Sequence, residues 1–372
     1  MSSETNLPIP AADLRPQNYQ LRTQLVAAVE SVLERGQFIL GPNVHAFEHE
    51  VADYLGVAQA IGVNSGTDAL ILALRALEIG AGDEVITTPF TFFATAEAIS
   101  AVGADPVFVD IDPNTFVVEP EAVAAAITDR TRALIPVHLY GHAAPMNELA
   151  AIAEPHGLAL IEDAAQSFGG RLDGRRLGTL GHVGALSFFP SKNLGGFGDG
   201  GMVTTDDAEL AERVRWLRTH GSKRKYQNEM IGYNTRLDEV QAAMLRVKLP
   251  HVDVWNKDRQ RVAQHYDHHL RDVKGVITPR TLPDVEHVFH QYTVRIASGD
   301  RDLVARKLRE HNIGTMVYYP VPVHRLPVYA TVGASLPMAE KAAGEVLSLP
   351  MFPHMTEREV ELVAQGIKTC LR

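Results

Sequence analysis

The feature that most limits the fold of this chain is a regular alternation of β-rich runs with helical patterns over residues 59–205. The β-rich runs lie at residues 60–63, 83–88, 106–111, 132–140, 158–164, 184–189 and 201–205. Between them, the apolar residues of segment 67–80 fall on one helical face. Apolar strands that alternate with helices predict an α/β fold with a mixed, mostly parallel sheet flanked by helices. Ligands of such sheets bind beyond the carboxyl ends of the strands.

A smaller α+β domain is expected after this region. The helical pattern of residues 236–270 should bend near Pro250 and lead into it. The strand-like run "HQYTVRI", a helix over about 302–312 and segment 314–324 would then build it. We therefore predict a large domain over residues 20–248 and a small C-terminal domain over residues 249–372, with residues 1–19 packed on the small domain.

Composition excludes several classes of function. Of the 372 residues, 45% are hydrophobic and 22% are charged, which is typical of a soluble globular protein. The formal net charge of −10 argues against a nucleic-acid partner. The single cysteine, Cys370, cannot form a disulfide framework or a cysteine-based metal site. The polar start lacks a signal-peptide core and no apolar run has the length of a membrane span, so we expect a cytoplasmic protein without a membrane partner.

One lysine, Lys192, stands between an apolar run and a glycine-rich stretch in "SFFPSKNLGGFGDGGM". Three interpretations compete: a phosphate-binding loop, a solvated lysine on a turn, and a lysine that bonds covalently to a cofactor. Gly196, Gly198 and Gly201 match the pattern G-x-G-x-x-G. A dinucleotide-binding loop needs a helix after the last glycine, whereas "MVTTDD" is typical of a strand and a turn.

Other strand ends carry complementary chemistry. Gly66 and Thr67 stand where a strand feeds a helix, and the free N–H groups there suit a phosphate. Asp163 ends an apolar strand, where a carboxylate either caps a helix or holds a protonated ring nitrogen. Phe92 or its neighbour Phe93 could stack on a flat ring. A phosphate, a flat ring, a protonated ring nitrogen and an aldehyde for a lysine together describe pyridoxal 5′-phosphate.

Four motifs carry a resemblance to a known family: "NSGTDAL", "EDAAQS", "SFFPSKNLG" and "GYNTRLDEVQAAML". The chain resembles the nucleotide-sugar aminotransferases of the DegT/DnrJ/StrS family, which are pyridoxal-phosphate enzymes of fold type I. The resemblance covers nearly the full length, from "RGQFILGPNVHAFEHEVADYLGV" to "LSLPMFP".

This resemblance implies roles for individual residues. Lys192 corresponds to the lysine that bonds to the cofactor, and Asp163 to the carboxylate that pairs with its pyridinium nitrogen. Gln166 corresponds to the amide that binds the phenolic oxygen of the ring, and Phe92 to the stacking aromatic. To act as a base, the freed Lys192 amine needs a pKa well below the roughly 10.4 of an exposed lysine.

The phosphate and the substrates involve a further set of residues. The family's phosphate site corresponds to Gly66, Thr67 and the Ser187 hydroxyl, together with Asn234 from the partner subunit of a homodimer with shared active sites. Substrate-side residues correspond to Arg236, Tyr318, Tyr319 and His324. The basic segment Lys223, Arg224 and Lys225 either contacts the substrate's diphosphate or is a solvated cluster. We predict no metal site, because His138, His142, His265, His268 and His269 lack a matching carboxylate or cysteine set.

The implied activity is transfer of an amino group from L-glutamate to a nucleotide-linked ketosugar, in amino-sugar and surface-polysaccharide (lipopolysaccharide O-antigen) biosynthesis. We favour a UDP-linked 3-keto sugar such as a UDP-2-acetamido-3-keto-hexuronate. A dTDP-linked 3-keto- or 4-keto-6-deoxyhexose is the alternative. A sugar dehydratase of the same fold would carry histidine in place of Lys192, and a non-enzymatic regulator would not need the full set of cofactor residues.

Overall fold

The computed structural model describes residues 8–297 and 300–371. Its centre is a seven-stranded sheet of strand order β1-β9-β8-β5-β4-β2-β3. The strands are β1 Gln59–Val63, β2 Glu84–Thr87, β3 Asp105–Phe108, β4 Thr131–Ile135, β5 Ala159–Asp163, β8 Val183–Ser187 and β9 Gly201–Thr205. Strand β9 is antiparallel to both neighbours and all other pairings are parallel. The predicted mixed, mostly parallel sheet is therefore confirmed.

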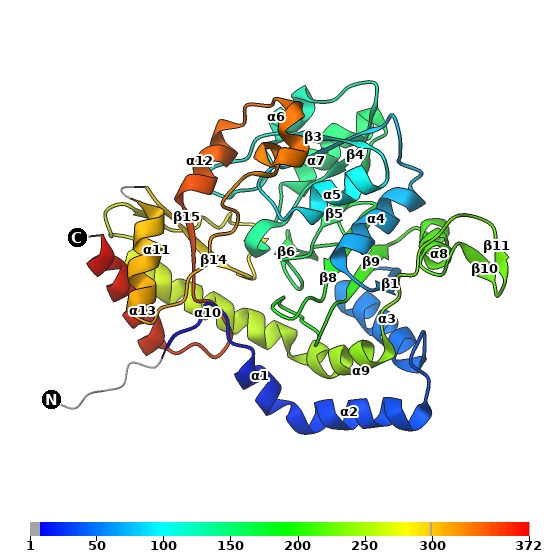
Figure 1. The fold of residues 1–372 in the computed structure, drawn as a ribbon, viewed down its shortest axis with the longest axis horizontal. Coiled ribbons are helices and arrows are strands. Elements are labelled where there is room, and N and C mark those ends of the chain that lie inside the picture. Colours follow the sequence, from blue (N-terminus) through cyan, green and yellow to red (C-terminus); the bar gives the residue numbers. More distant parts are fainter. Residues whose placement is uncertain (1–7, 298–299, 372) are drawn as a thin grey trace.

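Helices cover both faces of the sheet (Figure 1). On β5, Ile161 packs in a core cluster with α4 (Gly66–Ala76), α5 (Ala94–Ala101) and α8 (Ala208–Leu217). Its neighbour Leu160 packs on the opposite face, with α6 (Pro120–Ala125) and α7 (Met146–Ala153). Successive strand residues point to opposite faces, so a strand buried on both sides must be apolar at every position. This explains the continuous apolar runs of the sequence.

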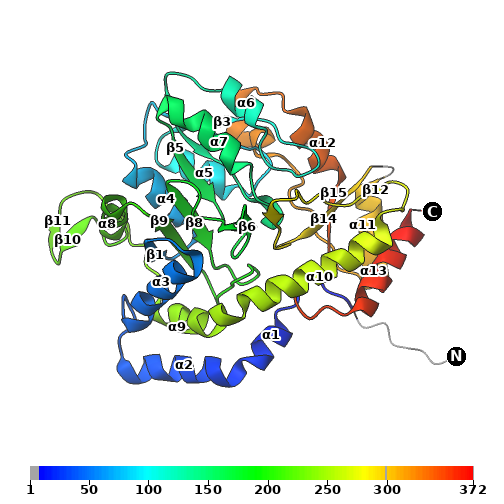
Figure 2. The same cartoon turned by 180° about the vertical axis from the view of Figure 1, so that it is seen from behind.

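The expected break near Pro250 is present. Helix α9 (Glu239–Lys248) is followed by a 3₁₀ turn (Leu249–His251) and then by α10 (Val252–Leu270). Helix α9 packs against α3 (Pro42–Leu55) and α2 (Arg22–Arg35), which follows the short α1 (Arg15–Gln20) (Figure 2). Trp255, early in α10, still belongs to the core formed around α3 and α9. The domain division between residues 248 and 249 stays a prediction.

A second core lies in the C-terminal part, around a three-stranded antiparallel sheet. Its elements are β12 Val276–Ile277, β14 Tyr292–Ile296, β15 Val346–Leu349, α11 Arg301–Glu310, α13 Glu357–Cys370 and the second half of α10. The buried residues of α12 (Pro337–Glu345) belong to a separate core cluster. Segment 314–324 contributes an isolated bridge between Met316 and Ser348 and a 3₁₀ turn from Val323 to Arg325. The N-terminal segment contacts this part of the chain at Ile9, whose N–H donates to the Asn312 carbonyl at 2.9 Å.

The remaining described strands form small sheets. Strands β6 (Arg171–Leu172), β7 (Arg175–Arg176) and β13 (Val285–Glu286) make one of them. The hairpin of β10 (Ser222–Arg224) and β11 (Gln227–Asn228) projects from the body of the molecule in both ribbon views (Figures 1 and 2). Within the described ranges, no helix is both long and apolar enough to cross a membrane.

Candidate active site

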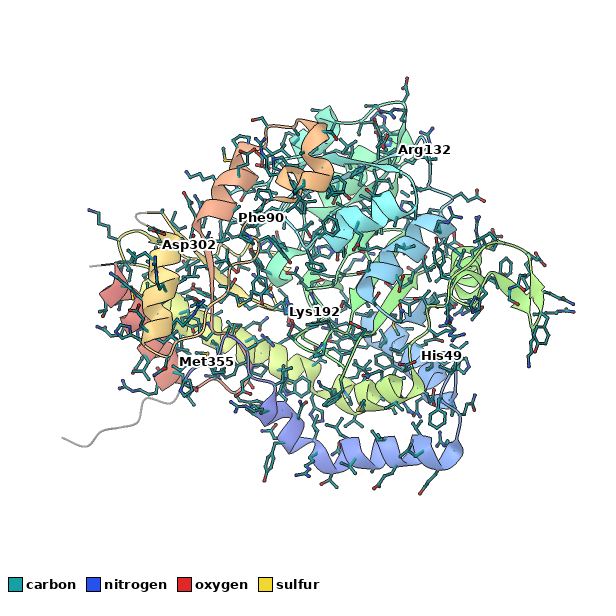
Figure 3. All side chains as sticks on the ribbon, viewed as in Figure 1. His49, Phe90, Arg132, Lys192, Asp302 and Met355 are labelled. Carbon is teal, nitrogen blue, oxygen red and sulfur yellow. The ribbon has the colours of Figure 1, made fainter. Side chains whose placement is uncertain are left out.

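A cavity of about 550 Å³ lies at the carboxyl ends of β5 and β8. It brings together most of the predicted site residues, namely Gly66, Thr67, Phe92, Asp163, Gln166, Ser187, Lys192, Tyr318 and Tyr319. Asp163 is the last residue of β5 and Ser187 is the last residue of β8. The location agrees with the expectation that ligands bind where parallel strands end. Lys192 lies close to the middle of the molecule in Figure 3.

Three predicted residues lie elsewhere. Asn234 and Arg236 line a neighbouring cavity of about 580 Å³, which shares Ser65 and Asp199 with the Lys192 cavity. His324 is buried, and its Nε2 lies 3.1 Å from Glu340 Oε1. It is not among the residues that line the Lys192 cavity. The cofactor-phosphate role of Asn234 and the substrate roles of Arg236 and His324 stay predictions.

Asp163 is a buried carboxylate with few partners of its own. Its Oδ2 accepts a hydrogen bond from the Thr95 hydroxyl at 2.8 Å, and its Oδ1 accepts one from the Ala165 N–H at 3.2 Å. Burial raises the pKa of Asp163, and the Thr95 hydrogen bond and the Lys192 charge oppose that rise. The residues after Asp163 form turns and not a helix, so the helix-cap alternative is wrong. A buried carboxylate without a cap role is suited to hold a cation.

Lys192 is partly buried, and burial lowers its pKa to about 8 while the Asp163 carboxylate opposes the shift. The glycines that follow allow the chain to fold back beside it. A Cβ on Gly195 would overlap the Pro190 carbonyl, and the chain then enters β9 beside β8. Because a strand follows the glycines, the dinucleotide interpretation is wrong. The solvated-turn interpretation does not fit a lysine that is partly buried and lines a cavity together with Asp163.

A candidate anion site lies where helix α4 and Ser187 line this cavity. Helix α4 begins at Gly66, and Ser65 caps it by accepting the Asp68 N–H at 3.0 Å. A Cβ on Gly66 would lie 2.8 Å from the Ser187 Cβ, so the helix start and the Ser187 side chain are adjacent. Free N–H groups and the helix dipole favour a phosphate at such a position.

The structure distinguishes between Phe92 and Phe93, the two aromatic residues that the sequence offered for stacking on a flat ring. Phe92 is 59% exposed and lines the cavity, whereas Phe93 packs on Tyr329 at a centroid distance of 6.0 Å. The structure thus places Phe92, and not Phe93, where a ring could stack. Gln166 is held in place, because its Oε1 accepts the Tyr140 N–H at 2.8 Å and its Nε2 donates to the Tyr319 hydroxyl at 3.0 Å.

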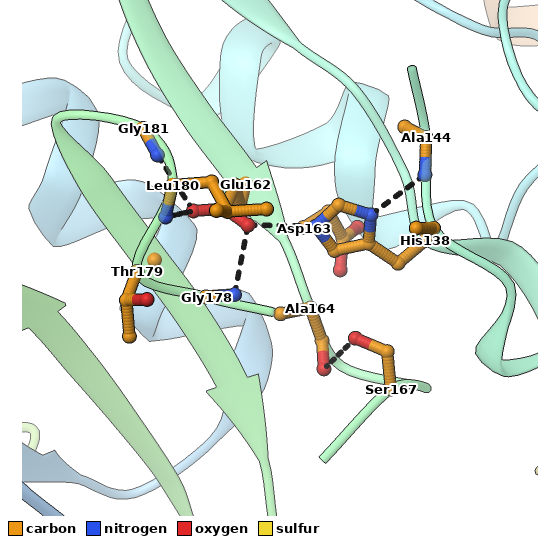
Figure 4. A network of polar contacts seen from close by, with 12 residues as sticks. His138, Ala144, Glu162, Asp163, Ala164, Ser167, Gly178, Thr179, Leu180 and Gly181 are labelled. Atoms are coloured by element: carbon orange, nitrogen blue, oxygen red, sulfur yellow. Dashed lines mark hydrogen bonds and ion pairs between the residues drawn. The ribbon is translucent and has the colours of Figure 1, made fainter. Parts of the chain in front are cut away.

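Behind Asp163 lies a polar network that the sequence does not reveal (Figure 4). The fully buried Glu162 carboxylate accepts hydrogen bonds from the backbone N–H groups of Gly178, Leu180 and Gly181. It also pairs with the buried His138, whose Nε2 lies 2.8 Å away. A signal for His138 was present in the sequence, but only as one of several histidines considered for a metal. Among the described residues, no group of three or more His, Cys, Asp or Glu side chains could hold a metal ion.

The cavity has other lining residues to which the sequence patterns assigned no site role. Thr95 lies on α5, and His290 and Gln291 directly precede β14. The basic residues Lys223, Arg224 and Lys225 lie on the projecting hairpin and do not line the Lys192 cavity of their own chain. Lys223 instead pairs with Glu229 at 2.8 Å and lies over the Trp216 ring.

The residues present fit pyridoxal 5′-phosphate. The anion site suits its phosphate, Phe92 its ring, Asp163 its protonated ring nitrogen and Lys192 its aldehyde. The fold and this site define a pyridoxal-phosphate-dependent aminotransferase of fold type I. The chain belongs to the DegT/DnrJ/EryC1/StrS aminotransferase family, which it matches over residues 20–368. Pyridoxal 5′-phosphate is the cofactor of this family.

Similar proteins span almost the whole chain. It is 50% identical to a pleiotropic regulatory protein of Geobacillus stearothermophilus, over 96% of this chain and 97% of that protein. It is 47% identical to a UDP-N-acetyl-3-dehydro-α-D-glucosamine 3-aminotransferase of Acidithiobacillus ferrooxidans, over 98% of this chain and 99% of that protein. It is also 47% identical to a dTDP-3-amino-3,4,6-trideoxy-α-D-glucose transaminase of Streptomyces venezuelae, over 99% of this chain and 98% of that protein.

Among solved structures, the chain is similar to S. venezuelae DesV in complex with a ketimine intermediate. The TM-score is 0.95 at 47% sequence identity, and the match covers 98% of this chain and 99% of that chain.

Proposed function

We propose that this protein transfers an amino group from L-glutamate to a ketosugar carried on a nucleoside diphosphate. The observation that carries the proposal is the presence of Lys192, with its lowered pKa, in one cavity with the buried Asp163 and an anion site. A dehydratase of this fold would carry histidine at position 192. The family and the names of the two sugar aminotransferases above support the same class of reaction.

Each side chain has a task that its position suits. Bound pyridoxal 5′-phosphate supplies the electron sink that lets a proton leave the carbon next to the transferred nitrogen. Lys192 Nζ would take that proton and return it to the carbon on the other side of the transferred nitrogen, which a pKa of about 8 permits near neutral pH. The Asp163 carboxylate keeps the ring nitrogen protonated. The Gly66 and Thr67 N–H groups and the Ser187 hydroxyl hold the phosphate, and Phe92 stacks on the ring.

For the acceptor we favour a UDP-linked 3-keto sugar, such as UDP-2-acetamido-3-keto-hexuronate. The name of the A. ferrooxidans relative supports amination at C3 of a UDP-sugar. The S. venezuelae relative is equally similar, and its name supports a dTDP-linked 3-amino sugar as the competitor. Amination at C4 of a 6-deoxyhexose is the remaining alternative. The product would enter surface-polysaccharide biosynthesis, including O-antigen, in the cytoplasm.

We further propose a homodimer with shared active sites. Asn234 would reach the cofactor phosphate of the partner subunit. Arg236 and the basic hairpin residues would bind the diphosphate of the acceptor there, and Tyr318, Tyr319 and His324 would approach the sugar from the small domain. The position of Asn234 outside the Lys192 cavity of its own chain supports this arrangement.

The test is amination of UDP- and dTDP-linked 3-keto and 4-keto sugars with L-glutamate, followed through 2-oxoglutarate release. We expect one UDP-linked 3-keto sugar to give the highest kcat/KM, and Lys192→Ala to abolish turnover while circular dichroism stays unchanged. Turnover by Lys192→Ala within tenfold of the wild type would overturn the role of Lys192. Absence of turnover with every ketosugar would favour the alternative of a non-enzymatic regulator. The name of the G. stearothermophilus relative, a pleiotropic regulatory protein, supports that alternative.

A further inference from the structure

Two adjacent polar side chains in the Lys192 cavity have unused hydrogen-bonding capacity. His290 is 7% exposed, and its buried Nδ1 has no hydrogen-bond partner among the described residues. The buried Oε1 of Gln291 also has no partner among the described residues, and turning the amide over would place its Nε2 N–H group at the same position. Both side chains line the cavity that contains Lys192. Buried polar atoms are normally paired, so two adjacent exceptions on one cavity wall indicate that a ligand completes them.

The backbone around these residues is firmly held, so the unpaired atoms do not result from a loose loop. Asn193, the neighbour of Lys192, donates from Nδ2 to the Val288 carbonyl at 3.1 Å. Arg259 lies below the segment and directs its Nη1 at the His290 carbonyl. The Gln291 N–H donates to the Tyr140 carbonyl at 3.4 Å. The segment is thereby tied to the residue that follows Lys192 and to the loop after β4.

The other nitrogen-bearing side chains of the cavity are already occupied. Gln166 uses its Oε1 and Nε2 on Tyr140 and Tyr319, and Lys192 is assigned to the reaction. No arginine is among the described residues that line the cavity. An amino-acid donor nevertheless needs a partner for the carboxylate beside its reacting carbon. His290 and Gln291 are the remaining side chains with N–H groups on this wall.

We propose that His290 and Gln291 bind the α-carboxylate of the amino-acid donor, an inference that rests on the proposed aminotransferase function. Burial and the nearby Lys192 and Arg259 cations hold the pKa of His290 well below its usual range, so the ring is neutral. A neutral imidazole offers one N–H donor and the Gln291 amide offers two. Neutral donors hold a carboxylate less tightly than an arginine would. This suits a cavity that must release the 2-oxo acid before a chemically different acceptor enters.

The test compares His290→Phe, which removes both ring nitrogens, with Gln291→Leu, which removes the amide at similar volume. His290→Gln restores an N–H donor and serves as the rescue variant. His156→Phe, at an exposed histidine far from the cavity lining, is the matched control. The first readout is the dissociation constant of glutarate, an unreactive dicarboxylate, measured by calorimetry on the holoenzyme of each variant. Circular dichroism and cofactor content establish that each variant is folded and loaded.

We expect His290→Phe and Gln291→Leu each to raise the dissociation constant of glutarate about tenfold, His290→Gln to recover most of the loss, and His156→Phe to change nothing. The KM for L-glutamate should rise in parallel, while the KM for the ketosugar stays within twofold. The half-reaction with 4-aminobutyrate, which lacks the α-carboxylate, should be insensitive to His290→Phe.

Unchanged glutarate affinity in both folded variants would overturn the proposal, as would a rise in the KM for the ketosugar alone. If His290→Phe does not fold, Gln291→Leu and His290→Gln decide the outcome by the same measurement. Glutarate binding does not require a sugar acceptor. If glutarate binding depends on His290 but no ketosugar is aminated, the result would contradict the proposed function and would still support this inference.

Discussion

His138 Nε2 lies 2.8 Å from Glu162 Oε2, and both side chains are completely buried. His138 Nδ1 accepts the Ala144 N–H at 2.9 Å, so the ring proton resides on Nε2 and is donated to the carboxylate. The His138 backbone N–H also donates to the Asp163 carbonyl at 3.1 Å. One histidine thus holds both members of the Glu162–Asp163 pair, and only the second member faces the cavity.

Glu162→Gln should destabilise the protein, because the amide NH2 group would oppose backbone N–H groups that now donate to a carboxylate. We expect the free energy of unfolding to fall by about 3 kcal/mol. Urea denaturation of the apo protein measures it. Glu121→Gln, at an exposed position on α6, is the control and should stay within about 0.5 kcal/mol of the wild type. Equal stabilities of the two variants would mean that the buried network contributes little.

Asp163→Asn should retain the cofactor and lose most of the rate, because an amide cannot stabilise a protonated ring nitrogen. We expect kcat to fall at least about a hundredfold, which corresponds to roughly 2.7 kcal/mol of barrier. Steady-state kinetics and the visible spectrum of the loaded enzyme measure both effects. Asp173→Asn, on the exposed turn between β6 and β7, should leave kcat unchanged. Near-normal kinetics of Asp163→Asn with full cofactor content would contradict the role assigned to the carboxylate.

The pH dependence of stability should report the buried Lys248. Its Nζ donates to the Gly195 carbonyl in the loop after Lys192, and burial lowers the pKa of Lys248 to about 8. Between pH 8 and about 10.4, the unfolded chain binds this proton and the folded chain does not, so stability rises with pH in that window. Lys248→Met removes the titration. The stability of the wild type relative to this variant should therefore increase by up to about 3 kcal/mol across the window.

Guanidinium denaturation at a series of pH values tests this prediction. Lys257→Met, at an exposed lysine of α10, should follow the wild type in parallel. A constant difference between the wild type and Lys248→Met from pH 7 to 10.5 would show that Lys248 is not desolvated in the folded protein.

Mixing two inactive variants should test the shared active site. Lys192→Ala lacks the amine to which we assign the reaction, and in the proposed dimer Asn234→Asp would place a carboxylate against the phosphate of the partner's cofactor. In a mixed dimer, one site collects both defects and the other collects neither. Random pairing makes about half of the dimers mixed, so activity should return to roughly a quarter of the wild type. No recovery, despite subunit exchange shown by mass spectrometry, would mean that Asn234 serves its own chain.

Local patterns were sufficient to predict the sheet, because the apolar runs required strands buried on both faces. That Asp163 and Ser187 end neighbouring parallel strands is known only from the structure. The same reasoning could not assign the neighbouring acids Glu162 and Asp163, because adjacent strand residues point to opposite faces and the sequence does not say which face is the cavity. The structure shows that the Glu162 carboxylate points away from the cavity, because it accepts hydrogen bonds from the loop at residues 178–181.

Contacts between distant segments were beyond sequence reasoning. Thr95 binds Asp163 across 68 residues, and Asn193 binds the Val288 carbonyl across 95 residues. The sequence placed His290 only in a strand-like run. That its Nδ1 is unpaired and that its side chain lines the cavity are known only from the folded structure. Side-chain roles of this kind depend on tertiary packing and leave no periodic trace in the sequence.

The antiparallel pairing of β8 with β9 limits which part of this region can vary in sequence without a change of fold. Ser187 pairs with Gly201 and the Phe188 N–H donates to the Gly200 carbonyl, so the loop that carries Lys192 is closed at its base by the sheet itself. The lysine to which we assign the reaction therefore lies in a loop that is anchored at both ends by paired strands. We expect that a substitution at position 192 can change the chemistry of the cavity while the strand registers stay the same.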